Sequence, residues 1–210
     1  MRVQENVSLK RLNSFGIEAS ARYFVEVADQ DEVAAFVSEP QFTDKPLLIL
    51  GGGSNLLLRH NFDGVVLKVG FSGIELLRED NDHYYLEVGA GENWHGLVMH
   101  CVSNGYAGIE NLSLIPGNVG AAPMQNIGAY GVELKDVFEK LEATEIRSGE
   151  SREFSIDECQ FGYRDSIFKN ELRGKYMITS VTLRLSKAAH LNTAYGAIEE
   201  ELKSMNVGEV

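Results

Sequence analysis

Short apolar runs alternate with polar or glycine-rich turns in the first ninety residues, a pattern typical of short strands. Four such runs predict strands, at residues 23–27, 46–50, 65–69 and 84–88. Between the first two runs lies a predicted helix, which Asp29 or Asp31 can cap. Its apolar face holds Val33, Phe36 and Val37. This half of the chain therefore mixes short strands with a helix.

The second half repeats this mixture. The apolar residues of 94–102 recur at helical spacing, and Gly105 is a natural residue to end that helix. Residues 137–146 and 152–154 predict a hairpin, 176–185 predicts a long strand, and 197–205 has a helical pattern. Because helices and strands do not alternate strictly, we predict an α+β fold. We place a domain boundary between 69 and 79, which gives domains of residues 1–72 and 73–210.

One stretch in the second half fits neither pattern. Residues 112–131 (LSLIPGNVGAAPMQNIGAYG) hold four glycines and two prolines, which exclude a regular helix or central strand. The stretch carries no charge and is largely apolar, so it indicates buried irregular backbone. Buried backbone groups need partners, and a large polar ligand would supply them, with Gln125, Asn126 and Tyr130 adding side-chain contacts. A tight crossover without a ligand is the alternative.

A second glycine-rich segment follows the apolar strand at 46–50. Residues 51–55 (GGGSN) lack Cβ atoms at three successive positions, so their N–H groups can converge on an anion. No Gly-Lys-Ser/Thr follows, and Leu56 stands where a dinucleotide fingerprint has its third glycine. The residues alone leave two interpretations open, a phosphate site and a plain turn.

Charge narrows the range of partners. Nineteen basic and 31 acidic residues give a formal charge of −12, which opposes binding to nucleic acid or an anionic membrane. We expect neither partner, and we expect a monomer. An anionic ligand would need a local positive site. Arg164, within 163–166 (YRDS), could provide one, or it could simply pair with Asp165 at the surface.

Cysteine and histidine usage adds little chemistry. Cys101 and Cys159 are too few for a disulfide framework, and Cys101 lies on the apolar helix face, as a buried thiol would. The histidines are scattered, and His95 and His100 do not share a helix face, so no metal site is predicted. No apolar run reaches the ~18 residues of a membrane span, and the N-terminus lacks the apolar core of a signal peptide. We therefore expect a cytoplasmic protein.

Five motifs in order span nearly the whole chain: 13–16 (NSFG), 51–55 (GGGSN), 89–94 (GAGENW), 115–131 (IPGNVGAAPMQNIGAYG) and 162–169 (GYRDSIFK). Their order and spacing resemble the UDP-N-acetylenolpyruvoylglucosamine reductase family, also called MurB. The resemblance implies a two-domain FAD cradle, with a small α/β domain and a larger mixed α+β domain. It also implies noncovalent FAD, NADPH as hydride donor, and a pyrophosphate contact at the glycine loop. The cofactor-binding residues that it implies are Gly51, Gly52, Gly53, Ser54, Asn55, Leu56, Ile115, Pro116, Gly117, Gly120, Ala121, Gln125, Asn126, Gly128, Ala129 and Tyr130.

The family reaction reduces the enolpyruvyl ether of UDP-N-acetylglucosamine to UDP-N-acetylmuramate during peptidoglycan precursor synthesis. The resemblance makes Arg164 the catalytic arginine, which would stabilise the negative charge that develops on the substrate. It places Tyr163, Arg164 and Tyr195 at the substrate, although an ordinary loop tyrosine is an equally good interpretation of Tyr195.

The family also uses a serine and a glutamate from a third domain, and nothing in this chain matches their segments. Ser166 belongs to the arginine motif and is not the proton donor. We therefore expect the FAD-binding portion of the reductase, inactive by itself. Two alternatives remain open: another oxidoreductase on the same cradle, and a noncatalytic flavin-binding module. Many flavin-dependent oxidases attach FAD through His or Cys, and neither glycine-rich segment contains one.

Overall fold

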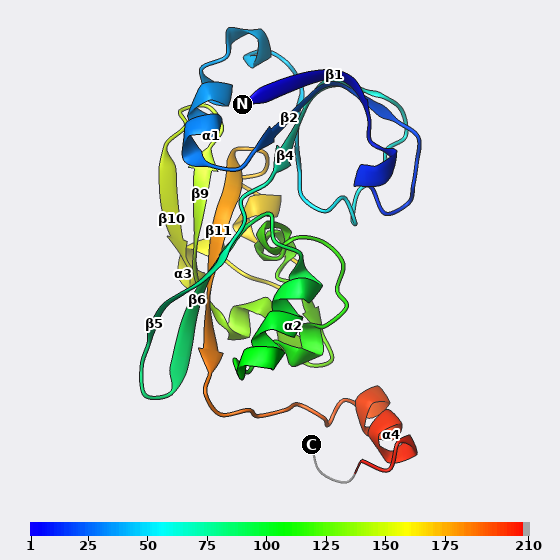
Figure 1. The fold of residues 1–210 in the computed structure, drawn as a ribbon, viewed down its shortest axis with the longest axis vertical. Helices are drawn as coiled ribbons and strands as arrows, with labels where there is room; N and C mark the ends of the chain where they lie inside the picture. Colours follow the sequence, from blue (N-terminus) through cyan, green and yellow to red (C-terminus); the bar gives the residue numbers. More distant parts are fainter. Residues whose placement is uncertain (208–210) are drawn as a thin grey trace.

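The first sheet, sheet A, occupies the N-terminal third of the chain. The structure is a computed structural model, and it describes residues 1–207 (Figure 1). Sheet A has the strand order β1-β2-β4-β3, in which β2, β4 and β3 run parallel and β1 runs antiparallel to β2. Its strands are β1 (Arg2–Ser8), β2 (Ser20–Val27), β3 (Leu47–Leu50) and β4 (Phe62–Val69).

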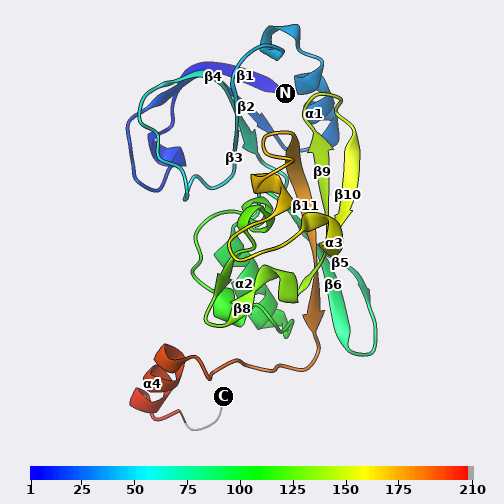
Figure 2. The same ribbon diagram turned by 180° about the vertical axis from the view of Figure 1, so that it is seen from behind.

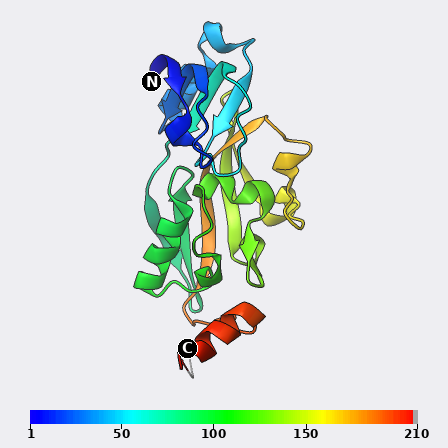
Figure 3. The same cartoon turned by 90° about the vertical axis from the view of Figure 1, so that its right-hand side faces the viewer.

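The second sheet, sheet B, is antiparallel throughout and has the order β10-β9-β11-β6-β5. Its strands are β5 (Ile74–Glu79), β6 (His83–Gly89), β9 (Phe138–Glu145), β10 (Ser151–Ser155) and β11 (Tyr176–Ser186). The long central strand β11 runs along the molecule with β9 and β6 as its neighbours (Figures 1 and 2). Viewed from the side, the two sheets follow one another along the long axis (Figure 3).

Helices are few and short. The α-helices are α1 (Gln30–Val37), α2 (Trp94–Asn104), α3 (Ile156–Cys159) and α4 (Gly196–Ser204). The single-turn 3₁₀ helices are η1 (Lys10–Leu12), η2 (Pro40–Phe42), η3 (Glu110–Leu112), η4 (Val119–Ala121), η5 (Pro123–Gln125), η6 (Leu134–Asp136) and η7 (Ile167–Lys169). A two-stranded ribbon joins β7 (Gly128–Ala129) to β8 (Val132–Glu133). Helix α4 lies beyond the end of sheet B, and none of its side chains is buried (Figure 3).

The two longer helices of the body begin and end at capping residues. The carboxylate of Asp29 accepts the backbone N–H of Glu32 at the start of α1, and Asn93 accepts that of Gly96 at the start of α2. Helix α2 ends at Gly105, which has a φ of 72°, in the left-handed region that glycine adopts without strain. Both helices start where the sequence predicts them.

Buried side chains link the two sheets. One hydrophobic cluster includes Val25 and Leu67 of sheet A together with Val88 and Val181 of sheet B. A smaller cluster, which includes Leu50, covers another part of sheet A. The chain leaves sheet A at the end of β4 and enters sheet B at the start of β5. Because the larger cluster is continuous, the division into domains of residues 1–72 and 73–210 stays a prediction.

Most predicted elements are confirmed within a few residues, including the α1 and α2 helices and the β9–β10 hairpin. Strands β1 and β5 are not among the predicted ones, because most of their side chains are exposed and their apolar pattern is weak. The stretch 112–131 is irregular, as predicted, and contains only single 3₁₀ turns and one two-residue strand. No helix among residues 1–207 is long and apolar enough to cross a membrane.

Candidate functional site

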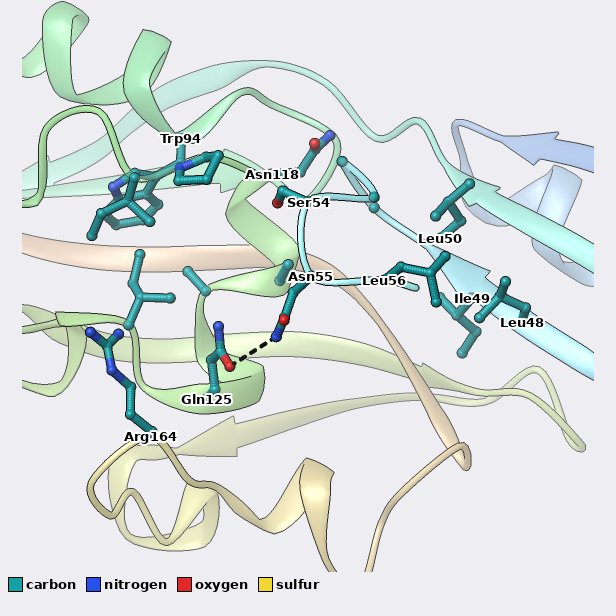
Figure 4. Close-up of a pocket in the computed structure, with 18 residues that line it drawn as sticks. Leu48, Ile49, Leu50, Ser54, Asn55, Leu56, Trp94, Asn118, Gln125 and Arg164 are labelled. Carbon is teal, nitrogen blue, oxygen red and sulfur yellow. Dashed lines mark hydrogen bonds between the residues drawn. The ribbon is translucent and has the colours of Figure 1, made fainter. Parts of the chain in front are cut away.

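The glycine loop, residues 51–56, and the stretch 112–131 meet at a cavity of about 470 Å³ (Figure 4). This volume lies within the usual ~300–1,000 Å³ of small-molecule sites. The predicted site residues that line it are Gly51, Gly52, Gly53, Ser54, Asn55, Leu56, Ile115, Pro116, Ala121, Gln125 and Arg164. In the close-up, Arg164 and Trp94 lie at one end, with Leu48, Ile49 and Leu50 at the other.

The glycine loop lines this cavity and has backbone donors without a partner in the protein. Within residues 1–207, no backbone N–H from Gly51 to Leu56 donates to another group of the protein. Successive unpartnered N–H groups beside a cavity form the kind of concave site that binds anions. This observation favours the phosphate interpretation of the loop over the plain turn.

Close backbone packing brings the two segments together. A Cβ added to Gly52 would lie 2.6 Å from Oδ1 of Asn118 and 2.9 Å from Cα of Gly117. Both distances are shorter than a real Cβ contact, so a side chain at Gly52 would push the segments apart. The glycine at this position therefore allows the cavity to have two facing walls.

The protein itself satisfies much of the backbone in the stretch 112–131. Val119 N–H donates to the carbonyl of Glu92, and Gly120 N–H donates to that of Ala90, both at 2.9 Å. The carbonyl of Gly117 accepts the N–H of Trp94 at 3.0 Å. The expectation that a ligand must supply these partners is thus wrong for this part of the stretch.

Two predicted amide contacts have different surroundings. The Nδ2 of Asn55 donates to Oε1 of Gln125 at 3.3 Å, which links the two cavity walls (Figure 4). Asn126 is fully buried; its Nδ2 donates to the carbonyl of Gly162, and its Oδ1 accepts the N–H of Lys135, each at 3.0 Å. The side chain of Asn126 thus supports the turn that carries Arg164. Its cofactor contact stays a prediction.

Arg164 sits in a tight turn with a φ of 53°, in the left-handed region that is strained for a residue with a side chain. Its guanidinium donates to the carbonyl of Gly128 at 2.6 Å, and its own carbonyl accepts from Lys169 Nζ at 2.8 Å. The carboxylate of Asp165 instead accepts the amide of Asn170 at 3.1 Å. Arg164 forms no ion pair within residues 1–207. The alternative interpretation, in which Arg164 simply pairs with Asp165 at the surface, is therefore wrong.

Arg164 also sets the charge of the cavity. Of the residues that line it within the described part of the chain, Arg164 is the one that carries a charge. The protein as a whole has a formal charge of −12. The cavity is therefore a local positive site in an acidic protein, which is what an anionic ligand requires.

Ser166 has a structural role beside this turn. It is fully buried, its hydroxyl donates to the carbonyl of Met124 at 2.8 Å, and it accepts the N–H of Phe168. These bonds tie the arginine turn to η5. The expectation that Ser166 is not the proton donor stays a prediction.

Eight predicted site residues lie outside the cavity lining: Gly117, Gly120, Asn126, Gly128, Ala129, Tyr130, Tyr163 and Tyr195. Tyr163 is 87% exposed, and the rings of Tyr130 and Tyr195 meet edge to face with centroids 5.5 Å apart. The amide of Asn111 donates to the carbonyls of Tyr130 and Asn192 and so links the two segments that carry these rings. The substrate roles of the tyrosines stay predictions.

The sequence analysis did not identify several lining residues, namely Leu48, Ile49, Leu50, Trp94, Asn118, Ala122 and Ile127. Trp94 and Asn118 lie within motifs, but apolar periodicity assigns Trp94 to the helix core. Its Nε1–H donates to the carbonyl of Leu112 at 2.9 Å. The sequence signal for residues 48–50 was their place in the apolar strand that leads directly into the glycine loop.

A second cavity, of about 850 Å³, lies between the α1–β3 segment and the β9–β10 turn. Its lining carries both signs of charge, including Lys45, Arg147 and Lys175 together with Glu39 and Asp44. It contains neither glycine-rich segment and no motif singled out in the sequence. The first cavity is therefore the better candidate.

Reactive thiols and metal ligands do not contribute to the site. Burial raises the pKa of both Cys101 and Cys159 to about 12, and neither lines the cavity. Among the described residues there is no cluster of His, Cys, Asp or Glu that could hold a metal.

Known proteins similar to this chain are named as reductases. The chain is 54% identical over 205 residues to the UDP-N-acetylenolpyruvoylglucosamine reductase of Amoebophilus asiaticus, and 47% identical over 208 residues to that of Chromobacterium violaceum. These matches cover 98% and 99% of the chain, but it spans only about 60% of the length of these relatives. The resemblance carried by the five motifs is confirmed.

Solved structures agree at the level of the fold. The MurB structure from Thermus caldophilus superposes with a TM-score of 0.72 at 27% identity, covering 100% of this chain and 71% of that one. A VAO-type flavoprotein from Myceliophthora thermophila superposes with a TM-score of 0.56 at 17% identity, over 80% of this chain and 32% of that one, which shows the fold alone. The predicted α+β fold is confirmed. Residues 21–155, more than half of the chain, match the family described as FAD binding domain, and the chain belongs to this family.

Proposed function

We propose that this chain is the FAD-binding part of an NADPH-dependent reductase that converts UDP-N-acetylglucosamine enolpyruvate to UDP-N-acetylmuramate. One observation carries the proposal: the unpartnered N–H groups of the glycine loop and the guanidinium of Arg164 line one cavity. The identity to named reductases supports the choice of substrate. Peptidoglycan precursor synthesis is the corresponding cellular role.

The cavity has the groups that FAD requires. The N–H groups of residues 51–56 suit the pyrophosphate, because they have no partner in the protein and belong to residues that line the cavity. Trp94 and the apolar residues 48–50 suit the aromatic parts of the cofactor. No Cys or His lines the cavity within the described residues, so we propose noncovalent binding.

Bound FAD supplies hydride transfer between NADPH and the substrate. Arg164 stabilises the negative charge that develops on the carboxylate and α-carbon of the enolpyruvyl group when hydride reaches its β-carbon. Arginine suits this role because it remains charged and presents several donors. The bond to Gly128 and the strained backbone hold the guanidinium at the cavity. Tyr163 and Tyr195 would contact the substrate from outside the cavity.

Two half-reactions separate this role from a structural one. In a protein that extends the chain to the full length of its relatives, Arg164→Ala should slow substrate reduction about a hundredfold, or ~3 kcal/mol. Flavin reduction by NADPH should change much less, because that step develops no charge on the substrate. Stopped-flow absorbance of the flavin measures both. Arg152→Ala is the control, since Arg152 pairs with Glu158 away from the cavity.

Equal losses in both half-reactions would mean that Arg164 has only a structural role. Flavin reduction without product would favour another oxidoreductase, and flavin binding without any reduction would favour a noncatalytic module. We further propose a monomer in the cytoplasm that binds neither nucleic acid nor membrane. The support for these points is the acidic net charge and the two free, buried thiols.

A further inference from the structure

A turn between β1 and β2 is held together by the side chain of Asn13. This residue is only 6% exposed, and both the nitrogen and the oxygen of its side-chain amide form hydrogen bonds. Its Nδ2 donates to the carbonyls of Leu9 at 2.8 Å and Ile17 at 3.0 Å, and its Oδ1 accepts the N–H of Ile17 at 2.9 Å. These bonds join both ends of residues 9–17, a segment that contains the first motif, 13–16, to which no role has been assigned.

This turn presses against the glycine loop. The N–H of Ser14 donates to the carbonyl of Gly53 at 3.1 Å. Gly53 has a φ of 65°, and a Cβ added to it would lie 1.9 Å from the carbonyl oxygen of Leu12. The turn and the loop are thus in direct backbone contact, and only glycine fits at the contact. The position of the turn therefore determines the position of Gly53.

The contact also orients the next peptide group. In a trans peptide, the C=O of one residue and the N–H of the following residue point in opposite directions. The carbonyl of Gly53 points at Ser14, so the N–H of Ser54 points away from the turn. That N–H has no acceptor within residues 1–207, and Ser54 lines the cavity.

We propose that the Asn13 turn is a positioning device for anion binding: it holds the Gly53–Ser54 peptide so that the Ser54 N–H donates to the FAD pyrophosphate. The inference rests on the proposed binding of FAD in this cavity. Asn13 touches no ligand and acts through Ser14 and Gly53. A purely structural turn would stabilise the small cluster around Leu9 without affecting the Ser54 donor.

The test compares Asn13, between β1 and β2, with Asn61, which lies between β3 and β4. Asn13→Ala releases the turn. Asn61→Ala is the matched control, because Asn61 accepts the N–H of Ser20 at 3.0 Å, at the start of β2, and does not line the cavity. FAD dissociation constants come from quenching of flavin fluorescence. We expect Asn13→Ala to raise the FAD dissociation constant at least tenfold, as for loss of a hydrogen bond to a charged group. Asn61→Ala should raise it less than twofold.

A second variant guards against simple unfolding. Ser14→Pro removes the N–H that Gly53 accepts and leaves the Asn13 amide intact. The backbone of Asn13 has φ −140° and ψ 138°, an extended conformation that a residue before proline favours. We expect Ser14→Pro to raise the FAD dissociation constant at least tenfold. Its unfolding midpoint without FAD should stay close to that of Asn61→Ala.

The amide of Ser54 provides a direct signature. In ¹⁵N-labelled protein, saturating FAD should shift the Ser54 amide in the parent, and this shift should be lost in Asn13→Ala while that of Ile115, in the other glycine-rich segment that lines the cavity, is retained. An unperturbed Ser54 amide in FAD-loaded parent protein would overturn the inference, as would FAD binding by both turn variants as tight as that of Asn61→Ala. A parent protein that binds no FAD would instead refute the proposed function, and this inference with it.

Discussion

Replacing Gly53 with alanine tests whether the glycine loop and the Asn13 turn are in contact as described. Two costs apply at this position. The left-handed φ of 65° is unfavourable for alanine, and the new Cβ would lie 1.9 Å from the Leu12 carbonyl oxygen. Gly105→Ala is the matched control, because Gly105 has a φ of 72° and its added Cβ meets nothing within 4 Å.

The difference between the two variants isolates the close contact. The backbone conformation costs about 1–2 kcal/mol in each. Forcing atoms into a packed region adds about 1–3 kcal/mol for Gly53→Ala alone. We therefore expect Gly53→Ala to lower the free energy of unfolding by ~2–5 kcal/mol and Gly105→Ala by ~1–2 kcal/mol.

Urea denaturation of the FAD-free proteins, followed by circular dichroism, measures both free energies of unfolding. Fluorescence titration then measures FAD affinity, which should fall at least tenfold for Gly53→Ala because the neighbouring donors move. Gly105→Ala should bind FAD like the parent. Equal free energies of unfolding for the two variants would show that the contact between Gly53 and Leu12 does not exist as described.

Further predictions address the core, the arginine turn and the acid stability. Cys101 and Cys159, whose pKa values are raised to about 12 by burial, should not react with a thiol reagent at pH 8 until the protein is denatured; prompt reaction in native protein would refute their burial. Asn126→Ala should cost about 1–3 kcal/mol by leaving two backbone groups without partners, and a urea titration that shows no change would contradict this. The Asp80 carboxylate accepts the N–H of Asp82 and two further hydrogen bonds, which lower its pKa to about 2. Because its folded pKa lies below the unfolded value of about 3.9, its stabilisation is present above pH 4 and lost as the pH falls towards 2. Asp80→Asn should therefore make the free energy of unfolding depend less steeply on pH in this window. An unchanged slope would contradict the lowered pKa of Asp80.

Local chemistry explains why many elements could be predicted. Asp29 and Asn93 cap their helices with their own side chains, and Gly105 ends α2 through its own backbone conformation. The exposed strands β1 and β5 have no such signal. Their existence depends on hydrogen bonds to neighbouring strands, which burial patterns do not encode.

The candidate site shows the same limit. The glycine content of the sequence is enough to predict the two segments that form the walls of the cavity, but not that they contact each other. Which side chains face the cavity depends on how the walls pack, and even two adjacent amide side chains can point in different directions. Gln125 bridges to the glycine loop, whereas the adjacent Asn126 turns into the protein to hold the arginine turn. Sequence neighbours therefore do not share a role here, and only the three-dimensional arrangement distinguishes them.

Hydrogen exchange of the 210-residue chain with and without FAD tests the central claim most directly. If the cofactor lies between the two glycine-rich segments, FAD should slow exchange in peptides that cover residues 48–56 and 115–127. Peptides that cover 36–47 and 145–147, around the second cavity, should be unaffected. Protection at the second cavity alone, or no change with FAD in large excess, would contradict the account.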